Sequence, residues 1–280
     1  MKKIILIMTI LFASFLQAKT NIVVSITPQK LFVQKIGGEK VAVKVMVKPG
    51  NSPHTYEPKP SQMKDIAKAD IYFSIGVEFE EAWLPRFTNQ NQKMAVFHID
   101  KNIEKIDMAH KERKSHSEHE KGAKNPHIWV SPKNVEIIAH NIYDALIKVD
   151  SKNSSYYKKN LEKFLKEIIQ IDKEITEILK NVKKDTRFMV FHPSWGYFAK
   201  EYELKEIAIE VGGKSPTPKN IIKIMKEAKE VGVKAIFVQP EFSDKIAKTL
   251  SNELQIPIIK ISPLSGNWPE NLIQLAKAIK

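Results

Sequence analysis

The chain has 280 residues, with 45 Lys and Arg against 32 Asp and Glu, and 42% of its residues are hydrophobic. This length and composition are typical of a globular protein of about two domains, and they exclude a largely disordered or collagen-like chain. There is no cysteine, which excludes disulfides, thiolate metal sites, iron–sulfur clusters and a cysteine nucleophile. Any bound metal must therefore be held by His, Asp, Glu, backbone oxygen or water.

Residues 1–18 resemble a secretory signal peptide. Lys2 and Lys3 precede an apolar run at 4–16, and a small residue, Ala18, stands before the expected cut. The run is shorter than the about 20 apolar residues of a membrane-spanning helix. We therefore expect the mature protein to be free in the periplasm, with no lipid anchor because no Cys follows the cut. The formal net charge of +13 is interpreted as a solvated surface, and nucleic acid is not an expected partner.

The first half of the mature chain alternates between short apolar runs and helical segments. Strands are expected at 21–26, 41–47, 71–76, 95–99 and 128–130. A helix is expected at 60–69, and another from 132 to about 146, where Ser131 and Pro132 form a hydroxyl cap followed by proline at the first helical position. The segment 107–124 is rich in Lys, Glu and His and has no apolar period, which predicts a mobile loop.

A long amphipathic helix is predicted near the middle of the chain. Residues 154–182 contain no Gly or Pro, and apolar residues recur at three- and four-residue spacing. At 1.5 Å per residue this helix would be roughly 40 Å long. A second series follows, with strands expected at 188–191, 207–209, 235–238 and 256–261. Helices are expected at 195–202, 218–230 and 243–254, and a final helix runs to Lys280.

This alternation predicts an α/β fold of two lobes, each with a mainly parallel sheet flanked by helices. The N-terminal lobe is expected at 19–150 and the C-terminal lobe at 183–280, with the long helix at 151–182 joining them. Ligands favour domain interfaces and the carboxyl ends of parallel strands. The cleft between the lobes is therefore the expected binding site.

Three of the eight histidines lie at predicted strand boundaries, each beside a proline. His54 follows one strand, His127 opens another and His192 ends a third. Proline fixes the local backbone, and rigid placement is what a preorganised metal ligand requires. Each residue alone is equally consistent with an ordinary loop histidine, but together the three could converge on one metal in the cleft.

The other histidines carry weaker signals. His98 alternates with apolar strand residues and is expected to be held by a hydrogen-bond partner. Glu136 and His140 lie four apart on a predicted helix, where a surface pair is the simpler interpretation than a metal site. An accessory weak zinc site could form within 107–124, although ordering a loop opposes tight binding. Its residues would be His110, His116 and His119.

Three segments together resemble the ligand motifs of the metal-binding solute-binding proteins of ABC transporters, most closely the periplasmic zinc-binding protein of high-affinity zinc uptake systems. The resemblance covers essentially the whole mature chain. It implies a two-lobed fold with a rigid linking helix, no enzymatic activity, and a metal held by His54, His127 and His192. The segments are Pro53-His54-Thr55-Tyr56-Glu57-Pro58 with Pro60-Ser61, Asn125-Pro126-His127-Ile128-Trp129, and His192-Pro193-Ser194-Trp195-Gly196-Tyr197-Phe198.

Two departures from the family leave the fourth coordination position open. The family often has Asp before Pro-Leu late in the chain, where this sequence has Ser262, and many members have Asp where it has Asn125. Water, Glu57 and Glu241 are the candidates for the fourth ligand.

The resemblance implies a monomeric periplasmic protein that captures Zn²⁺ and delivers it to an inner-membrane ABC permease. Three histidines plus water are also the template of a zinc-dependent hydrolase, with Glu57 or Glu241 as base, although no His-Glu-x-x-His pattern occurs. A manganese-binding or adhesin-type relative of the same fold is the other alternative. Because Mn²⁺ prefers oxygen ligands and imidazole suits zinc, the three histidines favour zinc.

Overall fold

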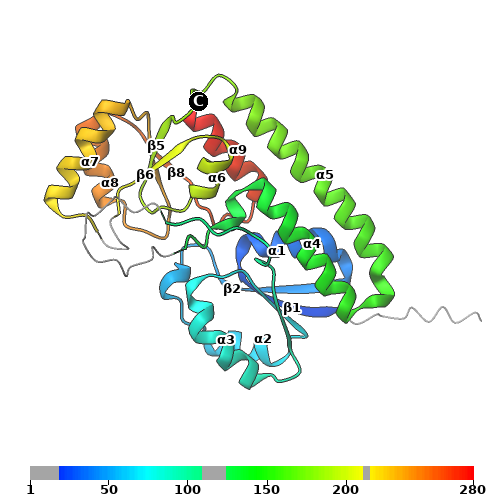
Figure 1. The fold of residues 1–280 in the computed structure, drawn as a ribbon. Helices are drawn as coiled ribbons and strands as arrows, with labels where there is room; N and C mark the ends of the chain where they lie inside the picture. Colours follow the sequence, from blue (N-terminus) through cyan, green and yellow to red (C-terminus); the bar gives the residue numbers. More distant parts are fainter. Residues whose placement is uncertain (1–18, 109–123, 211–214) are drawn as a thin grey trace, which may run out of the picture.

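The computed structural model describes residues 19–108, 124–210 and 215–280. Two four-stranded sheets, each flanked by helices, lie side by side, and one long helix runs along the molecule from one lobe to the other (Figure 1). Every pair of neighbouring strands in both sheets is parallel. In the described residues, no helix has both the length and the apolar character needed to cross a bilayer.

The N-terminal sheet has the strand order β2-β1-β3-β4. Its strands are β1 (Thr20–Ile26), β2 (Val41–Val47), β3 (Ile71–Ser74) and β4 (Ala95–His98). Its helices are α1 (Thr27–Gly37), α2 (Pro60–Ala67), α3 (Glu78–Gln90) and α4 (Pro132–Val149). Four short 3₁₀ turns interrupt this half: η1 (Gly38–Lys40), η2 (Pro53–Thr55), η3 (Ile128–Val130) and η4 (Ser151–Asn153).

The C-terminal sheet repeats this order as β6-β5-β7-β8. Its strands are β5 (Arg187–Val190), β6 (Lys205–Ala208), β7 (Ile236–Val238) and β8 (Ile258–Lys260). Its helices are α6 (Gly196–Glu201), α7 (Pro218–Val231), α8 (Lys245–Leu254) and α9 (Trp268–Ile279).

The long helix is α5 (Ser154–Leu179), which packs on α1 and α4 of the N-terminal lobe and on α9 at the end of the chain (Figure 1). Its apolar stripe is buried, as the spacing predicts. The ring of Trp268 in α9 packs perpendicular to that of Phe32 in α1, at 5.3 Å between centroids, and Trp268 Nε1 donates to Trp129 O at 2.6 Å. One apolar core therefore continues from the N-terminal sheet through α5 and α9 into the C-terminal sheet.

A smaller apolar core occupies the other face of the C-terminal sheet, beneath α7 and α8. The sequence marks both ends of α7 clearly. Thr217 Oγ1 accepts from Asn220 N at 3.3 Å, Pro218 follows the cap, and Gly232 takes the left-handed conformation that ends the helix.

The fold class predicted from the sequence is confirmed, and the predicted strands match the observed ones within two residues at each end, with one exception. Residues 128–130 are not a strand but the 3₁₀ turn η3, so the prediction that His127 opens a strand is wrong. Ile128 N bonds Pro126 O and Val130 N bonds His127 O, within the segment itself. A short apolar run has no helical or strand period, and here its backbone bonds are local. The lobe boundaries at 150 and 182 stay predictions.

Candidate metal centre

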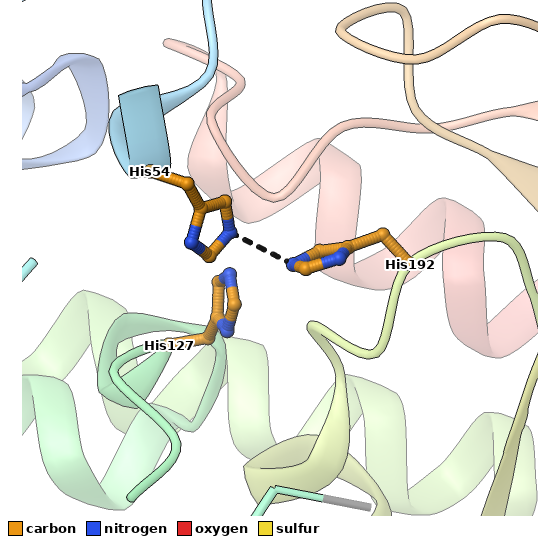
Figure 2. A group of neighbouring side chains, drawn as sticks. All are labelled: His54, His127 and His192. Carbon is orange, nitrogen blue, oxygen red and sulfur yellow. Dashed lines mark hydrogen bonds between the residues drawn. The ribbon is translucent and has the colours of Figure 1, made fainter. Parts of the chain in front are cut away.

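Three histidine side chains point toward one another from both lobes (Figure 2). His54 lies in η2 after β2, where Ser52 Oγ accepts from His54 N at 3.3 Å. His127 precedes η3, and His192 follows β5 by two residues. The parallel sheets place the residues after β2 and β5 at carboxyl ends of strands, where open α/β sheets bind their ligands.

The geometry of the three rings is that of a metal-binding group. His54 Nε2 and His192 Nε2 are 3.0 Å apart, and one ligand atom from each of the three residues lies within 4.8 Å of the others. Ring centroids are separated by 4.7 Å for His54 and His192, 5.4 Å for His127 and His192, and 6.0 Å for His54 and His127. Within the described residues, this is the group of His, Asp and Glu side chains compact enough to hold a metal.

Each ring has a second partner at its other nitrogen. His54 Nδ1 lies 2.8 Å from Glu78 Oε1 and His192 Nδ1 lies 2.9 Å from Glu210 Oε2. His127 Nδ1 lies 2.8 Å from Asn125 Oδ1, which also accepts from His127 N at 2.9 Å. A ring that donates its Nδ1–H to an oxygen keeps the lone pair of Nε2 free for a metal. These partners therefore fix the tautomer that metal binding needs.

The residues around His192 hold it on several sides. Gln239, which directly follows β7, accepts from His192 N at 3.3 Å and donates to His192 O at 2.8 Å. Phe242 stacks on its ring at 4.8 Å between centroids. Glu206 Oε1 accepts from Ser194 N and Trp195 N at 3.0 and 2.8 Å, which fixes the chain just after the ligand. His192 is 5% exposed, as is His127.

The electrostatics differ between the rings. Burial, followed by repulsion from His192 and His54, holds the pKa of His127 well below 6.5, so this ring is neutral at neutral pH. Burial also works to lower the pKa of His54, but the hydrogen bond and charge of Glu78, together with the charge of Glu210, outweigh it and raise that pKa. In return, although burial acts to raise it, the bond to His54 lowers the pKa of Glu78.

The loop that carries Glu78 is fixed by a buried carboxylate. Glu80, in the first turn of α3, accepts from Gly76 N at 2.8 Å and Ile75 N at 3.0 Å, and from the hydroxyl of Ser25. Burial raises the pKa of Glu80 to about 7. These bonds set the entry into α3 and so the position from which Glu78 reaches His54.

Neither carboxylate suggested as a fourth ligand joins the group. Glu57 is exposed, and Glu241 Oε1 accepts from Ser262 Oγ at 2.9 Å. Ser262 is thus engaged with Glu241, one of the two carboxylates. A fourth ligand from these two residues would require a side chain to move.

The remaining predicted residues lie apart from this centre. His98 is exposed and its Nδ1 bonds Ser74 Oγ at 2.8 Å, so it has the expected partner. Glu136 and His140 form no direct ion pair within the described residues, although attraction to His140 opposes the effect of burial, which raises the pKa of Glu136. The accessory site proposed for the 107–124 segment lies outside the described residues, as do its three histidines: His110, His116 and His119.

Sequence reasoning missed Glu78 and Glu210 altogether. Glu210 lies two residues after β6, and Glu78 opens α3, four residues after β3. Carboxylates just beyond the carboxyl ends of parallel strands are the signal that could have found them, since those ends gather at one edge of each sheet.

The donor set indicates which metals would fit. Three imidazole nitrogens with no carboxylate among them suit Zn²⁺, Cu²⁺ or Ni²⁺, whereas Mg²⁺ and Mn²⁺ prefer hard oxygen ligands. Three histidines around one point are also a known zinc arrangement with an open fourth position.

Several known proteins are similar to this chain. The chain is 27% identical over 291 residues to the zinc-binding protein AdcA of Streptococcus pyogenes serotype M3, covering 95% of this chain but only 56% of AdcA. It is 30% identical over 250 residues to the manganese ABC transporter substrate-binding lipoprotein scaA of Streptococcus gordonii, covering 86% of this chain and 78% of scaA. A crystal structure of ZnuA superposes with a TM-score of 0.86 at 36% identity, covering 92% of this chain and 97% of ZnuA.

Residues 22–280 match the family described as zinc-uptake complex component A, periplasmic. The match spans both lobes, all three histidine segments and the long helix. The chain therefore belongs to this family of metal-binding substrate-binding proteins of ABC transporters.

Proposed function

We propose that this protein captures Zn²⁺ outside the cytoplasm and passes it to an ABC-type membrane permease, with His54, His127 and His192 as the protein ligands of the transported ion. The observation that carries the proposal is the donor set, three convergent imidazoles with no carboxylate in the group. The relatives include zinc-binding and manganese-binding proteins, so it is this donor set that selects zinc.

The site suits a carrier better than a hydrolase. A hydrolase of this kind would need a general base beside the metal. Of the two residues suggested for that role, Glu57 is exposed and Glu241 is bonded to Ser262. A signal peptide at 1–18 and a periplasmic location complete the proposal, because a permease takes its substrate from a protein on that side of the membrane.

The test is a metal titration of the purified protein beginning at residue 19. We expect one tight Zn²⁺ equivalent per chain, retained against an equimolar amount of Mn²⁺ at neutral pH. Appreciable displacement of zinc by manganese would contradict the assignment and would require carboxylate ligands. Incubation of the zinc-loaded protein with ester and peptide substrates tests the hydrolase alternative, for which we expect no turnover.

A further inference from the structure

Two carboxylates stand directly behind two of the three imidazoles. Glu210 Oε2 lies 2.9 Å from His192 Nδ1 and Glu78 Oε1 lies 2.8 Å from His54 Nδ1, whereas His127 is backed by the neutral amide of Asn125. Three neutral imidazoles leave the 2+ charge of a bound dication unbalanced. The two carboxylates together carry a charge of the same size and opposite sign.

The burial of the two carboxylates differs. The side chain of Glu210 is 7% exposed and that of its partner His192 is 6% exposed, whereas Glu78 is 43% exposed. Water and salt screen an exposed charge far more than a buried one. The charge of Glu210 therefore acts on the centre more strongly than that of Glu78.

We propose that Glu210 and Glu78 are specificity-determining residues, which make the three-histidine site selective for a divalent over a monovalent cation by placing two negative charges behind the ligands. This inference rests on the proposed function. A carboxylate attracts a dication twice as strongly as a monocation at the same position. If the two glutamates act by charge, their removal must weaken the binding of a dication more than that of a monocation.

The charge-removing variants are Glu210→Gln and Glu78→Gln, which keep an oxygen that can accept the histidine N–H. Loss of such an outer partner typically lowers metal affinity about 10–100-fold. We expect Glu210→Gln to lower Zn²⁺ affinity within that range and to lower Ag⁺ affinity by roughly the square root of the same factor. Glu78→Gln should show the same pattern with smaller losses. Glu253→Gln, which removes an exposed carboxylate on α8 outside the group, should bind both ions as the unaltered protein does.

A negative charge can also be added behind the ring of His127, at Asn125. Asn125 Nδ2 and Glu206 Oε2 are both buried without a hydrogen-bond partner, and both border the space beside Gly196 where a Cβ would lie. Asn125→Asp alone would bring a second carboxylate toward Glu206, so it is combined with Glu206→Gln. Relative to Glu206→Gln alone, the double variant should bind Zn²⁺ roughly tenfold more tightly.

Titrations with Zn²⁺ and Ag⁺ alone, on variants whose urea unfolding matches the unaltered protein, decide between the outcomes. Equal losses for the two ions in Glu210→Gln would show that this residue only positions His192 and would overturn the inference. Unchanged zinc affinity in both Gln variants would overturn it as well. An unaltered protein that binds zinc no better than manganese would refute the proposed function, whatever the variants show, while a Zn²⁺-to-Ag⁺ ratio that falls in the Gln variants would still support the role of the charges.

Discussion

The two sheets have the same strand order but use the same position differently. In each, the chain reverses direction across the sheet between the first and third strands, β1 and β3 or β5 and β7, which is where open parallel sheets bind ligands. In the N-terminal sheet this position is closed, because a side chain bonds both strands there and none of its residues joins the three histidines. Gln29 accepts from Ile26 N at 2.9 Å and donates to Phe73 O at 3.0 Å, joining the two strands, and the buried Glu80 bonds Ser25 beside them.

In the C-terminal sheet a glutamine at this position, after the third strand, serves the site instead. Gln239 follows β7 and holds both the N–H and the carbonyl of His192. The ends of the second strands differ in the same way: His54, after β2, faces the centre, whereas Glu210, after β6, reaches only the back of His192. Topology thus fixes which positions lie near the ends of the strands. The residue at each position decides its role: to bond two strands together, to face the metal centre or to support a ligand.

The largest effect is expected in the C-terminal sheet, where the carboxyl end of β5 leads to His192. His192→Ala should lower Zn²⁺ affinity by more than about 100-fold, beyond the 10–100-fold typical of an outer partner, because it removes a direct donor. Competition with a chromogenic zinc chelator measures the change, and His98→Ala, outside the group, is the control. Zinc affinity equal to that of the unaltered protein would remove His192 from the site.

The second prediction concerns pH and Glu206, the buried carboxylate that holds the backbone just after His192. Burial raises the pKa of Glu206 to about 7, from 4.5 in the unfolded chain. Between these two pH values Glu206 is protonated in the folded state but not in the unfolded state. The free energy of unfolding therefore falls as pH rises through this window, and it levels off above it. The contribution is about 3 kcal/mol at ~1.36 kcal/mol per pH unit.

Glu206→Gln should therefore flatten part of the decrease in stability between pH 5 and pH 8. Urea unfolding of the metal-free protein at both values measures this. Glu80, with a pKa also raised to about 7 by burial, remains in the variant, so some pH dependence should persist. An unchanged pH profile would show that Glu206 does not titrate in this range.

The third prediction breaks the closed position. Gln29→Ala leaves Phe73 O and Ile26 N without their partner, which should lower the free energy of unfolding by about 1–3 kcal/mol. Zinc affinity should change little, because the closed position contributes no ligand. A large loss of zinc binding with normal stability would show that the two sheets are not used differently after all.

The smallest effect on the tight site is expected from the polar segment. Asp107 and Lys124 are joined by an antiparallel bridge and by an ion pair of 2.7 Å. The two points of the chain that a replacement linker must connect are therefore already close. Replacing residues 109–123 with a short Gly-Ser linker should remove weak additional zinc equivalents and leave the tight equivalent unchanged. Equilibrium dialysis with metal analysis gives both numbers, and loss of the tight equivalent would place a ligand in the segment.

The sequence by itself indicated the order of the strands, the long helix and the three histidines, because these signals are local, but it did not predict α1 and α3. Apolar periodicity, hydroxyl caps before proline and histidines beside proline are each read within a few residues. The exception, 128–130, is a short apolar run whose backbone bonds close within a turn, and period alone does not separate such a run from a strand.

Only the tertiary structure decided how the site is supported. Glu78, Glu210 and Gln239 reach histidines that lie on other segments of the chain. The one local signal they carry, a position just past a strand end, is shared by many other charged and polar residues. The sequence offered Glu241 as a possible metal ligand. Its hydrogen bond with Ser262 likewise depends on two loops coming together in the fold. Such pairings follow from how the sheets and helices pack, because distances across a fold are set by all the elements at once and not by spacing along the chain.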